Sequence, residues 1–163
     1  MFEFTESVRV DAPPGKVWKL LADVERWWPP SNPEHIRIDV LGRSKVIEVG
    51  TNINFEERVA GVKGKASGTI TRFIPEAEAT WEGVAEYRYF GLRFQVHEGV
   101  SWYVDKDGEA SRLSARVWAK FSSGMFGRLL EWYAKTLLNV IARDREHARC
   151  ELVYLRNTIE NNG

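Results

Sequence analysis

The chain of 163 residues contains little cysteine and no excess of charge of either sign. Its single cysteine, Cys150, excludes an internal disulfide and a zinc site built from several cysteines, and it fits a reducing cytoplasm. The 23 basic residues balance the 23 acidic ones, so there is no long-range attraction toward nucleic acid or an anionic membrane. We therefore expect a cytoplasmic protein with no nucleic-acid partner.

Long apolar runs, internal repeats and flexible linkers are also missing from the sequence. Its uninterrupted apolar stretches are a few residues long, whereas a membrane-spanning helix needs about 20. The first residues alternate between apolar and acidic types, unlike a targeting segment. The densest group of helix-breaking residues, Trp28–Pro33, is too short to separate two domains. These absences predict one domain over residues 1–163 and no stable insertion into a membrane.

Aromatic residues, by contrast, are plentiful. Seven Trp, eight Phe and five Tyr make up 12% of the chain. Each ring carries a large apolar area, so the rings must fill a core, line a pocket or form an interface. Rings that line a pocket would indicate a protein that binds small molecules, whereas rings at an interface would indicate a protein that binds a partner.

Hydrophobic periodicity predicts a strand, two short helices, six more strands and a long helix. Alternation over Phe2–Val10 is typical of a strand, and the prolines after it favour a helix that begins near Pro13 or Pro14. A second short helical turn around Val24–Trp28 is expected to end at the prolines that follow. The six further strands are joined by short links, which favour an antiparallel meander. Their expected ranges are His35–Leu41, Asn52–Val59, Lys65–Ile74, Ala79–Tyr87, Arg93–Val104 and Arg112–Phe121.

The last part of the chain has the period of a helix. From Ser123 to about Ile159, apolar residues recur at intervals of three, four and seven, which predicts one long helix. Asp144 interrupts the apolar stripe, so a kink or a change of packing partner is expected there. This order of elements predicts a fold of the α+β class. In it, a curved sheet would wrap around the long helix. The alternative is a sheet with the helix lying flat on one face, which would contain no cavity.

The segment Val8–Trp28 reads as an apolar-x-Ala-Pro-x-x-x-Val-Trp motif followed by Leu-x-Asp-x-x-x-Trp. Gly64–Pro75, Trp81, the strand pair around Asp105–Gly108 and the terminal helix then follow in a matching order. On these residues, nearly the whole chain resembles the helix-grip superfamily, also called SRPBCC. This superfamily includes START-domain, birch-pollen-allergen-like and polyketide cyclase/dehydrase proteins, and the pattern is most similar to the polyketide cyclase/dehydrase type.

The resemblance implies a helix-grip fold, in which a curved seven-stranded antiparallel sheet wraps around a long C-terminal helix and two short helices follow the first strand. Members of the superfamily bind lipids, sterols, polyketides, hormones or flavonoids between sheet and helix, and some catalyse cyclisation or dehydration. Because the superfamily has no universal catalytic residue, the resemblance assigns none to this chain.

Strand alternation predicts which side chains would face such a cavity. Trp27 and Trp28 lie just before the prolines, where this fold has its cavity mouth, although they could equally cap the edge of the core. The candidate ligand-binding residues are Trp27, Trp28, Phe55, Trp81, Tyr87, Phe94, Trp102, Tyr133 and Leu137. On the last strand Trp118 falls on the parity predicted to face solvent, and together with Trp132 it is a candidate surface for a homodimer.

Two carboxylates, Glu57 and Glu98, fall on otherwise apolar strand faces. A buried charge is costly unless it is paired, so each is a candidate polar anchor or general acid/base with a raised pKa. The structural alternative for each is a strand end, a bulge that reverses the parity or an ion pair, with Arg72 as a partner if both point inward. These two are the candidate catalytic residues, and whether the protein is an enzyme stays open.

The three histidines, His35, His97 and His147, are scattered and lack metal-ligand spacing, so we expect no metal and no cofactor. His97 and Glu98 are neighbours on a strand and therefore point to opposite faces. The alternating charges of residues 143–151 indicate a solvated helix face with ion pairs inside the helix.

Three functions fit these observations. The first is binding of a hydrophobic small molecule, such as a lipid, a polyketide-like compound or an aromatic compound, between the sheet and the C-terminal helix. The second is a cyclase or dehydratase that uses a buried carboxylate in the same pocket. The third is a partner-binding protein with a filled core, which a cavity too small for any ligand would favour.

Overall fold

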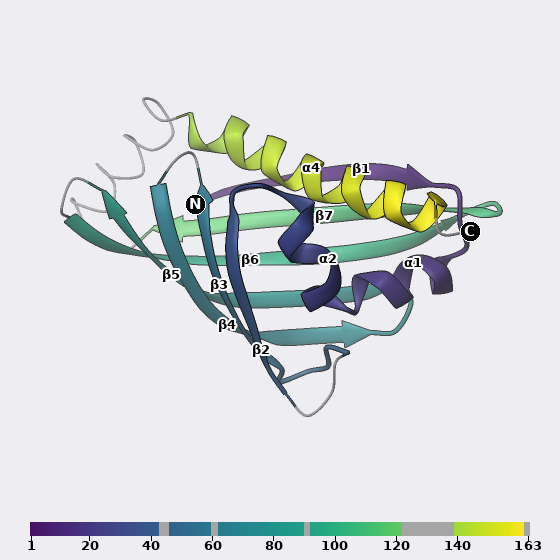
Figure 1. Cartoon of the computed structure of the whole chain (residues 1–163), viewed down its shortest axis with the longest axis horizontal. Helices are drawn as coiled ribbons and strands as arrows, with labels where there is room; N and C mark the ends of the chain where they lie inside the picture. Colours follow the sequence, from purple (N-terminus) through teal and green to yellow (C-terminus); the bar gives the residue numbers. More distant parts are fainter. Residues whose placement is uncertain (43–45, 60–61, 90–91, 122–138, 162–163) are drawn as a thin grey trace.

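The computed structural model describes residues 1–42, 46–59, 62–89, 92–121 and 139–161. A strand is followed by two short helices, six further strands and a helix near the end of the chain (Figure 1). The elements are β1 (Phe2–Val10), α1 (Pro14–Leu21), α2 (Val24–Ser31), β2 (His35–Leu41), β3 (Asn52–Val59), β4 (Val62–Ile74), β5 (Glu78–Tyr89), β6 (Leu92–Asp107), β7 (Ala110–Phe121) and α4 (Val140–Asn161).

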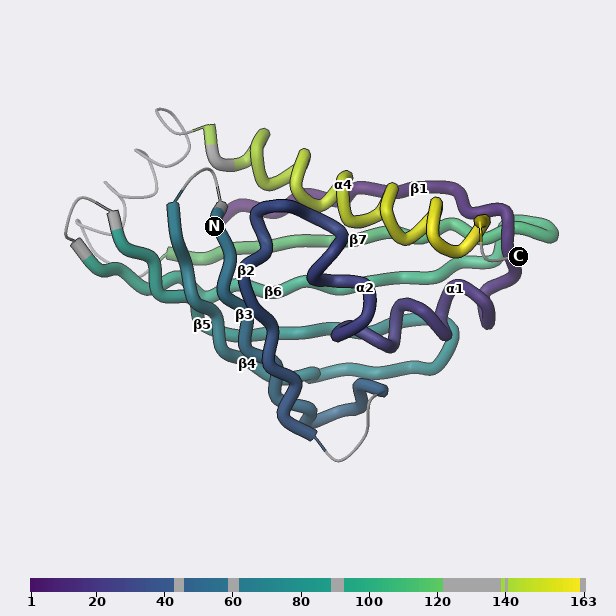
Figure 2. The backbone as a smooth tube through the Cα atoms, viewed as in Figure 1, coloured from purple at the N-terminus to yellow at the C-terminus, as the bar shows by residue number. Residues whose placement is uncertain are grey.

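The strands form one antiparallel sheet in the order β1-β7-β6-β5-β4-β3-β2. Strands β2 to β7 are a meander of neighbours, and β1 adds to the far edge by pairing with β7. Helices α1 and α2 therefore carry the chain from one edge strand to the other. They lie with α4 on the same side of the curved sheet (Figures 1 and 2). The predicted helix-grip fold is confirmed, and the flat arrangement is not observed.

The core lies between the concave face of the sheet and the helices α1, α2 and α4. A stripe on α4 with helical spacing is fully buried, namely Ala148, Leu152, Leu155 and Ile159. On the sheet, Val10 and Leu113 are completely excluded from solvent and belong to the same cluster. Burial of these side chains fixes the C-terminal half of α4 against the sheet.

Two predicted helix features differ from the structure. Helix α2 does not end before Pro29 and Pro30 but includes both and continues to Ser31. The two prolines occupy the last turn and are exposed, so the carbonyl groups of Glu25 and Arg26 that they leave unpaired lie on the solvent side. Helix α4 runs without a break through Asp144. The first part of the predicted long helix, residues 123–138, lies outside the described residues.

None of the described helices is long and apolar enough to cross a membrane. The expected location in the cytoplasm stays a prediction.

Truncation of Leu155 to alanine tests the packing of α4. Leu155 is 0% exposed, whereas Leu41 on the edge strand is 59% exposed. We expect Leu155→Ala to lower the free energy of unfolding by about 2–5 kcal/mol through lost burial and the cavity left behind. The same change at Leu41 should cost no more than about 0.5 kcal/mol. Urea unfolding monitored by tryptophan fluorescence measures both, and equal losses would mean that α4 is not docked as described.

Candidate functional site

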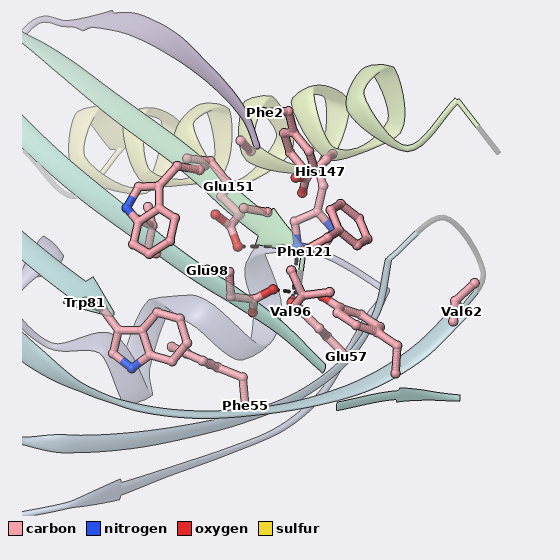
Figure 3. A pocket seen from close by; sticks show the side chains of 18 of the residues that line it. Phe2, Phe55, Glu57, Val62, Trp81, Val96, Glu98, Phe121, His147 and Glu151 are labelled. Carbon is pink, nitrogen blue, oxygen red and sulfur yellow. Dashed lines mark hydrogen bonds and ion pairs between the residues drawn. The ribbon is translucent and has the colours of Figure 1, made fainter. Parts of the chain in front are cut away.

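Residues of the described chain line a cavity of about 150 Å³ between the concave face of the sheet and α4 (Figure 3). Strands β1, β3, β4, β5, β6 and β7 contribute to its wall, together with α2 and residues 144–151 of α4. Among the described residues the core is therefore not filled on this side, whereas the partner-binding hypothesis assumes a filled core.

Six of the nine candidate ligand-binding residues line this cavity, namely Trp28, Phe55, Trp81, Tyr87, Phe94 and Trp102. Trp27 does not. It is 0% exposed, its Nε1 donates a hydrogen bond to the carbonyl of Leu21 at 2.9 Å, and its ring meets Trp102 edge-on. Consecutive residues on a helix point about 100° apart, so only one of the two adjacent tryptophans can face the cavity. Tyr133 and Leu137 lie outside the described residues.

Trp118 lies on the face of β7 that points away from the cavity, with the exposed Arg116 and Lys120, as strand parity predicted. It is only partly exposed, because its indole lies over Gly99 of the paired strand β6. A Cβ atom at Gly99 would stand 2.7 Å from the indole, so the missing side chain is what makes room for the ring. The homodimer surface expected at Trp118 and Trp132 stays a prediction, and Trp132 lies outside the described residues.

Glu98 lies on the cavity side of β6, between the small residues Gly83 and Ala119 of the flanking strands. The phenol of Tyr87 donates a hydrogen bond to Glu98 Oε2 at 3.0 Å. Tyr87 can adopt this position because its ring lies over Gly64, where a Cβ would be 2.5 Å from a ring carbon. Burial, reinforced by the charge of Glu57, raises the pKa of Glu98 to about 8 against the opposing effect of the Tyr87 hydrogen bond.

Two more carboxyl groups line the same cavity, Glu57 on β3 and Asp144 on α4. Burial raises the pKa of Glu57, while the imidazoles of His147 and His35 act against it. Burial and the charge of Glu57 raise the pKa of Asp144 to about 7. Arg72, considered as a partner for the inward carboxylates, is instead exposed and pairs with Glu78 at 2.7 Å, because a register shift in β4 follows Ile70.

Two of the three histidines are brought together by the fold. His35 Nε2 lies 2.8 Å from His147 Nε2 and 3.0 Å from Glu151 Oε1, and His147 Nε2 is 3.5 Å from the same oxygen. We call His35, His147 and Glu151 the imidazole cluster. The side chains of His35 and His147 are only 1% and 8% exposed, and Glu57 Oε2 approaches the two Nε2 atoms to 3.7 and 3.5 Å. His97, by contrast, is exposed on the opposite face of β6.

The Nδ1 atom of each imidazole in the cluster makes a polar contact of its own, which orients the ring. His35 Nδ1 faces the carbonyl oxygen of Trp28, and its ring stacks on that indole with 3.5 Å between centroids. His147 Nδ1 lies 3.3 Å from Glu34 Oε2. Burial disfavours a charged His147, but the hydrogen bond and charge of Glu151, with Glu57 and Glu34, raise its pKa to about 10. At Glu151, burial is outweighed by the hydrogen bonds and charges of His147 and His35, which lower its pKa to about 2.

The cavity therefore has an apolar part and a polar part. Figure 3 shows Glu57, Glu98, His147 and Glu151 directed toward one region, with Phe55 and Trp81 beside it. Such a site can bury an apolar body and hydrogen-bond a polar group at one end.

Four polar site residues were not predicted from the sequence, namely His35, Asp144, His147 and Glu151. The signal for the last two was present, since His147 and Glu151 are four residues apart and share one face of a helix. The charged stretch around them is only partly the solvated face that was expected. Arg145 and Arg149 are exposed but pair mainly with Glu6 of β1, at 3.2 and 3.1 Å.

Solved structures share this fold at low sequence identity. The aromatase/cyclase ZhuI from Streptomyces sp. R1128 superposes with a TM-score of 0.71 and 17% identity, over 99% of this chain and 94% of that one. A protein from Thermus thermophilus gives 0.65 and 17%, over 99% of both chains. A START superfamily protein from Mycobacterium smegmatis gives 0.57 and 11%, also over 99% of both. No curated protein is significantly similar to the chain in sequence.

The family described as "Polyketide cyclase / dehydrase and lipid transport" matches residues 1–149. This match covers every described strand, both short helices and α4 as far as Arg149, so that of the residues of α4 that line the cavity only Glu151 lies beyond it. The chain therefore belongs to the polyketide cyclase/dehydrase and lipid transport family.

Proposed function

We propose that the protein binds a compact, hydrophobic, ring-containing molecule that carries a hydroxyl or carbonyl oxygen. The observation that carries this proposal is the carboxyl group of Glu98, which faces an aromatic-lined cavity and is hydrogen-bonded by Tyr87. A cavity of about 150 Å³ is large enough for one aromatic ring. The aromatic walls supply affinity, and the carboxyl group selects for the oxygen.

Glu98 acts as a hydrogen-bond donor in this proposal. With a pKa of about 8, the carboxyl is mostly protonated at neutral pH. Its Oε2 accepts from Tyr87, so the other oxygen is available to carry the proton and donate it to a ligand oxygen. A neutral donor suits an apolar cavity because an uncompensated charge there would be costly.

The class of ligand is supported by the family and by one neighbour. The family's description combines polyketide chemistry with lipid transport, and the Streptomyces protein is named as an aromatase/cyclase. Of these classes, a polyketide-derived ring fits the short aromatic cavity better than an extended lipid chain.

A second candidate function is acid–base catalysis in the same cavity, and a specific observation favours it. Glu98 and Asp144 both line the cavity and have pKa values near 8 and 7. One group can then donate a proton while the other accepts one at neutral pH. For dehydration of a β-hydroxy ketone, Asp144 removes the proton next to the carbonyl and Glu98 protonates the departing hydroxyl. The carbon–oxygen bond breaks, water leaves and a carbon–carbon double bond forms.

Ligand selectivity tests the donor role of Glu98. Acetophenone and ethylbenzene have nearly the same shape, but only acetophenone has a carbonyl to accept a hydrogen bond. At pH 6 we expect acetophenone to bind about 2–10-fold more tightly, as one net neutral hydrogen bond allows. The preference should disappear above pH 9, when Glu98 ionises.

The control variants separate hydrogen bonding from shape. Glu98→Gln keeps a neutral donor and should retain the preference at both pH values, whereas Glu98→Leu should lose it. Titration calorimetry measures all three proteins. Equal binding of the two compounds to the native protein, or a preference that survives in Glu98→Leu, would exclude the proposed role.

The pH dependence of stability tests the raised pKa of Glu98 without any ligand. Because the folded form holds the proton more tightly than the unfolded form, the free energy of unfolding falls as the pH rises between the ordinary carboxyl pKa of 4.5 and about 8. The raised pKa values of Glu57, Asp144 and His147 change the free energy of unfolding with the same sign.

We expect Glu98→Gln to reduce the slope of the free energy of unfolding against pH, between pH 5 and 6.5, by about 1.4 kcal/mol per pH unit. Urea unfolding at several pH values measures the slope, and Glu82→Gln on the exposed face is the control substitution. An unchanged slope in Glu98→Gln would contradict a raised pKa.

The catalytic candidate predicts turnover of 4-hydroxy-4-phenylbutan-2-one to the conjugated ketone, followed by its ultraviolet absorption. Loss of a general acid or base lowers kcat by about 100- to 10,000-fold, so Glu98→Gln and Asp144→Asn should each be nearly inactive. No acceleration by the native protein, while acetophenone still binds selectively, would leave binding as the function and exclude this reaction.

A further inference from the structure

The imidazole cluster presents three mutually close polar atoms that face one another. The contacts between His35 Nε2, His147 Nε2 and Glu151 Oε1 are 2.8, 3.0 and 3.5 Å long. The atoms come from two elements far apart in the chain, strand β2 and helix α4. What lies between these atoms has to be positive, because each of them offers a lone pair when the rings are neutral.

The hydrogen bonds at the other ring nitrogens fix that tautomer. A carbonyl oxygen can only accept, so His35 Nδ1 carries a proton and donates it to Trp28. A carboxylate also accepts, so His147 Nδ1 donates to Glu34. Both Nε2 atoms are therefore lone-pair donors in the neutral rings. A histidine held by a backbone carbonyl or a carboxylate in this way is the usual arrangement behind a metal-bound imidazole.

A single proton cannot satisfy all three contacts. On His147 Nε2 it can serve the contact to His35 or the contact to Glu151, but it leaves the 3.0 Å contact between His35 and Glu151 as two lone pairs. On His35 Nε2 it can be shared between His147 and Glu151, but it leaves the 3.5 Å contact between those two as lone pairs. A second proton on His35 Nε2 would place two N–H groups 2.8 Å apart. One central cation satisfies all three atoms at once.

The dimensions suit a first-row transition metal. Three atoms with these separations lie on a circle of radius about 1.8 Å, so a point about 2.0–2.1 Å from each of them exists just outside their plane. That is the bond length of Zn²⁺ to imidazole nitrogen and carboxylate oxygen. Two imidazoles and one carboxylate are also a donor set that Zn²⁺ and Fe²⁺ accept. His147 and Glu151, four residues apart on α4, are held on one face before any metal binds.

We propose that His35, His147 and Glu151 bind a divalent first-row transition metal ion at the wall of the cavity. Three protein ligands leave a coordination position open, as in zinc sites that act on substrates. His147 and Glu151 line the cavity, so a water or a ligand oxygen there can reach the metal. Glu57, 3.5–3.7 Å from both Nε2 atoms, is positioned to accept a hydrogen bond from metal-bound water. This inference does not depend on the proposed ligand.

Zinc alone is the probe for the first experiment. Tag-free protein is treated with a chelator, dialysed and titrated with Zn²⁺ by calorimetry, in a Cys150→Ser background because the exposed thiol of Cys150 could bind zinc itself. We expect one equivalent to bind. His147→Ala and Glu151→Gln should each weaken binding by at least about tenfold. The matched controls, His97→Ala and Glu146→Gln, remove an exposed imidazole and an exposed carboxylate and should leave binding unchanged.

A measurement on the native sequence keeps the test independent of how the variants fold. In ¹⁵N-resolved NMR spectra of the imidazole rings, Zn²⁺ should shift the Nε2 signals of His35 and His147 and leave those of His97 in place. Absence of stoichiometric binding would mean that protons alone hold the cluster together, and would overturn the proposal. Binding that disappears with Cys150, or that persists with unshifted His35 and His147 signals, would overturn it as well.

Discussion

The contact between α4 and the far edge of the sheet, made through buried imidazoles and carboxylates, is the constraint on which the cavity depends. The C-terminal half of α4 packs with Leu152, Leu155 and Ile159 as an ordinary apolar stripe. Its N-terminal half instead carries polar groups, and His147 reaches His35 across the concave face. Polar groups cannot be buried unpaired, so this end of the helix has to meet its partners on β2 and β3. The sheet must curve far enough for that contact, and a cavity remains where the helix and the middle strands do not touch.

Burial has opposite consequences for the carboxyl groups, depending on what each one meets. Glu151 lies beside two imidazoles, and its pKa falls to about 2 despite burial. Burial raises the pKa of Glu98 to about 8, because among the described residues it meets the phenol of Tyr87 and the repulsion of other carboxylates, and no cation. The same low-polarity surroundings thus keep one carboxyl charged and the other neutral. The polar end of the cavity therefore offers an anionic position and a hydrogen-bond donor within one site.

Whether a feature of the fold or the site could be predicted from the sequence depends on how far apart in the sequence the interacting residues lie. Strand alternation is local, and it was sufficient for the seven strands and for the inward direction of Glu57 and Glu98. Register shifts and helix rotation are less local, so Trp27 was assigned to the cavity although only Trp28 faces it. The imidazole cluster joins residues 112 positions apart, and nothing near His35 in the sequence indicates that His147 lies opposite. Helix α2 passes through its two prolines because they lie on its solvent side while Trp28 and Ser31 beside them are buried, which depends on tertiary packing.

Glu57 links the two parts of the polar end. Its carboxylate is attracted by both imidazoles, and its negative charge is among the main reasons that the pKa values of Glu98 and Asp144 are raised. Any change that compensates the charge of Glu57 will therefore favour ionisation of Glu98, and any change that exposes that charge will favour the protonated form. Glu57 lies beside both imidazoles and lines the same cavity as Glu98, so it is the group that links the charge of the imidazole cluster to the protonation of Glu98. The carboxyl groups and imidazoles at the polar end of the cavity therefore form one electrostatic unit, in which the protonation of each group depends on the charge of its neighbours.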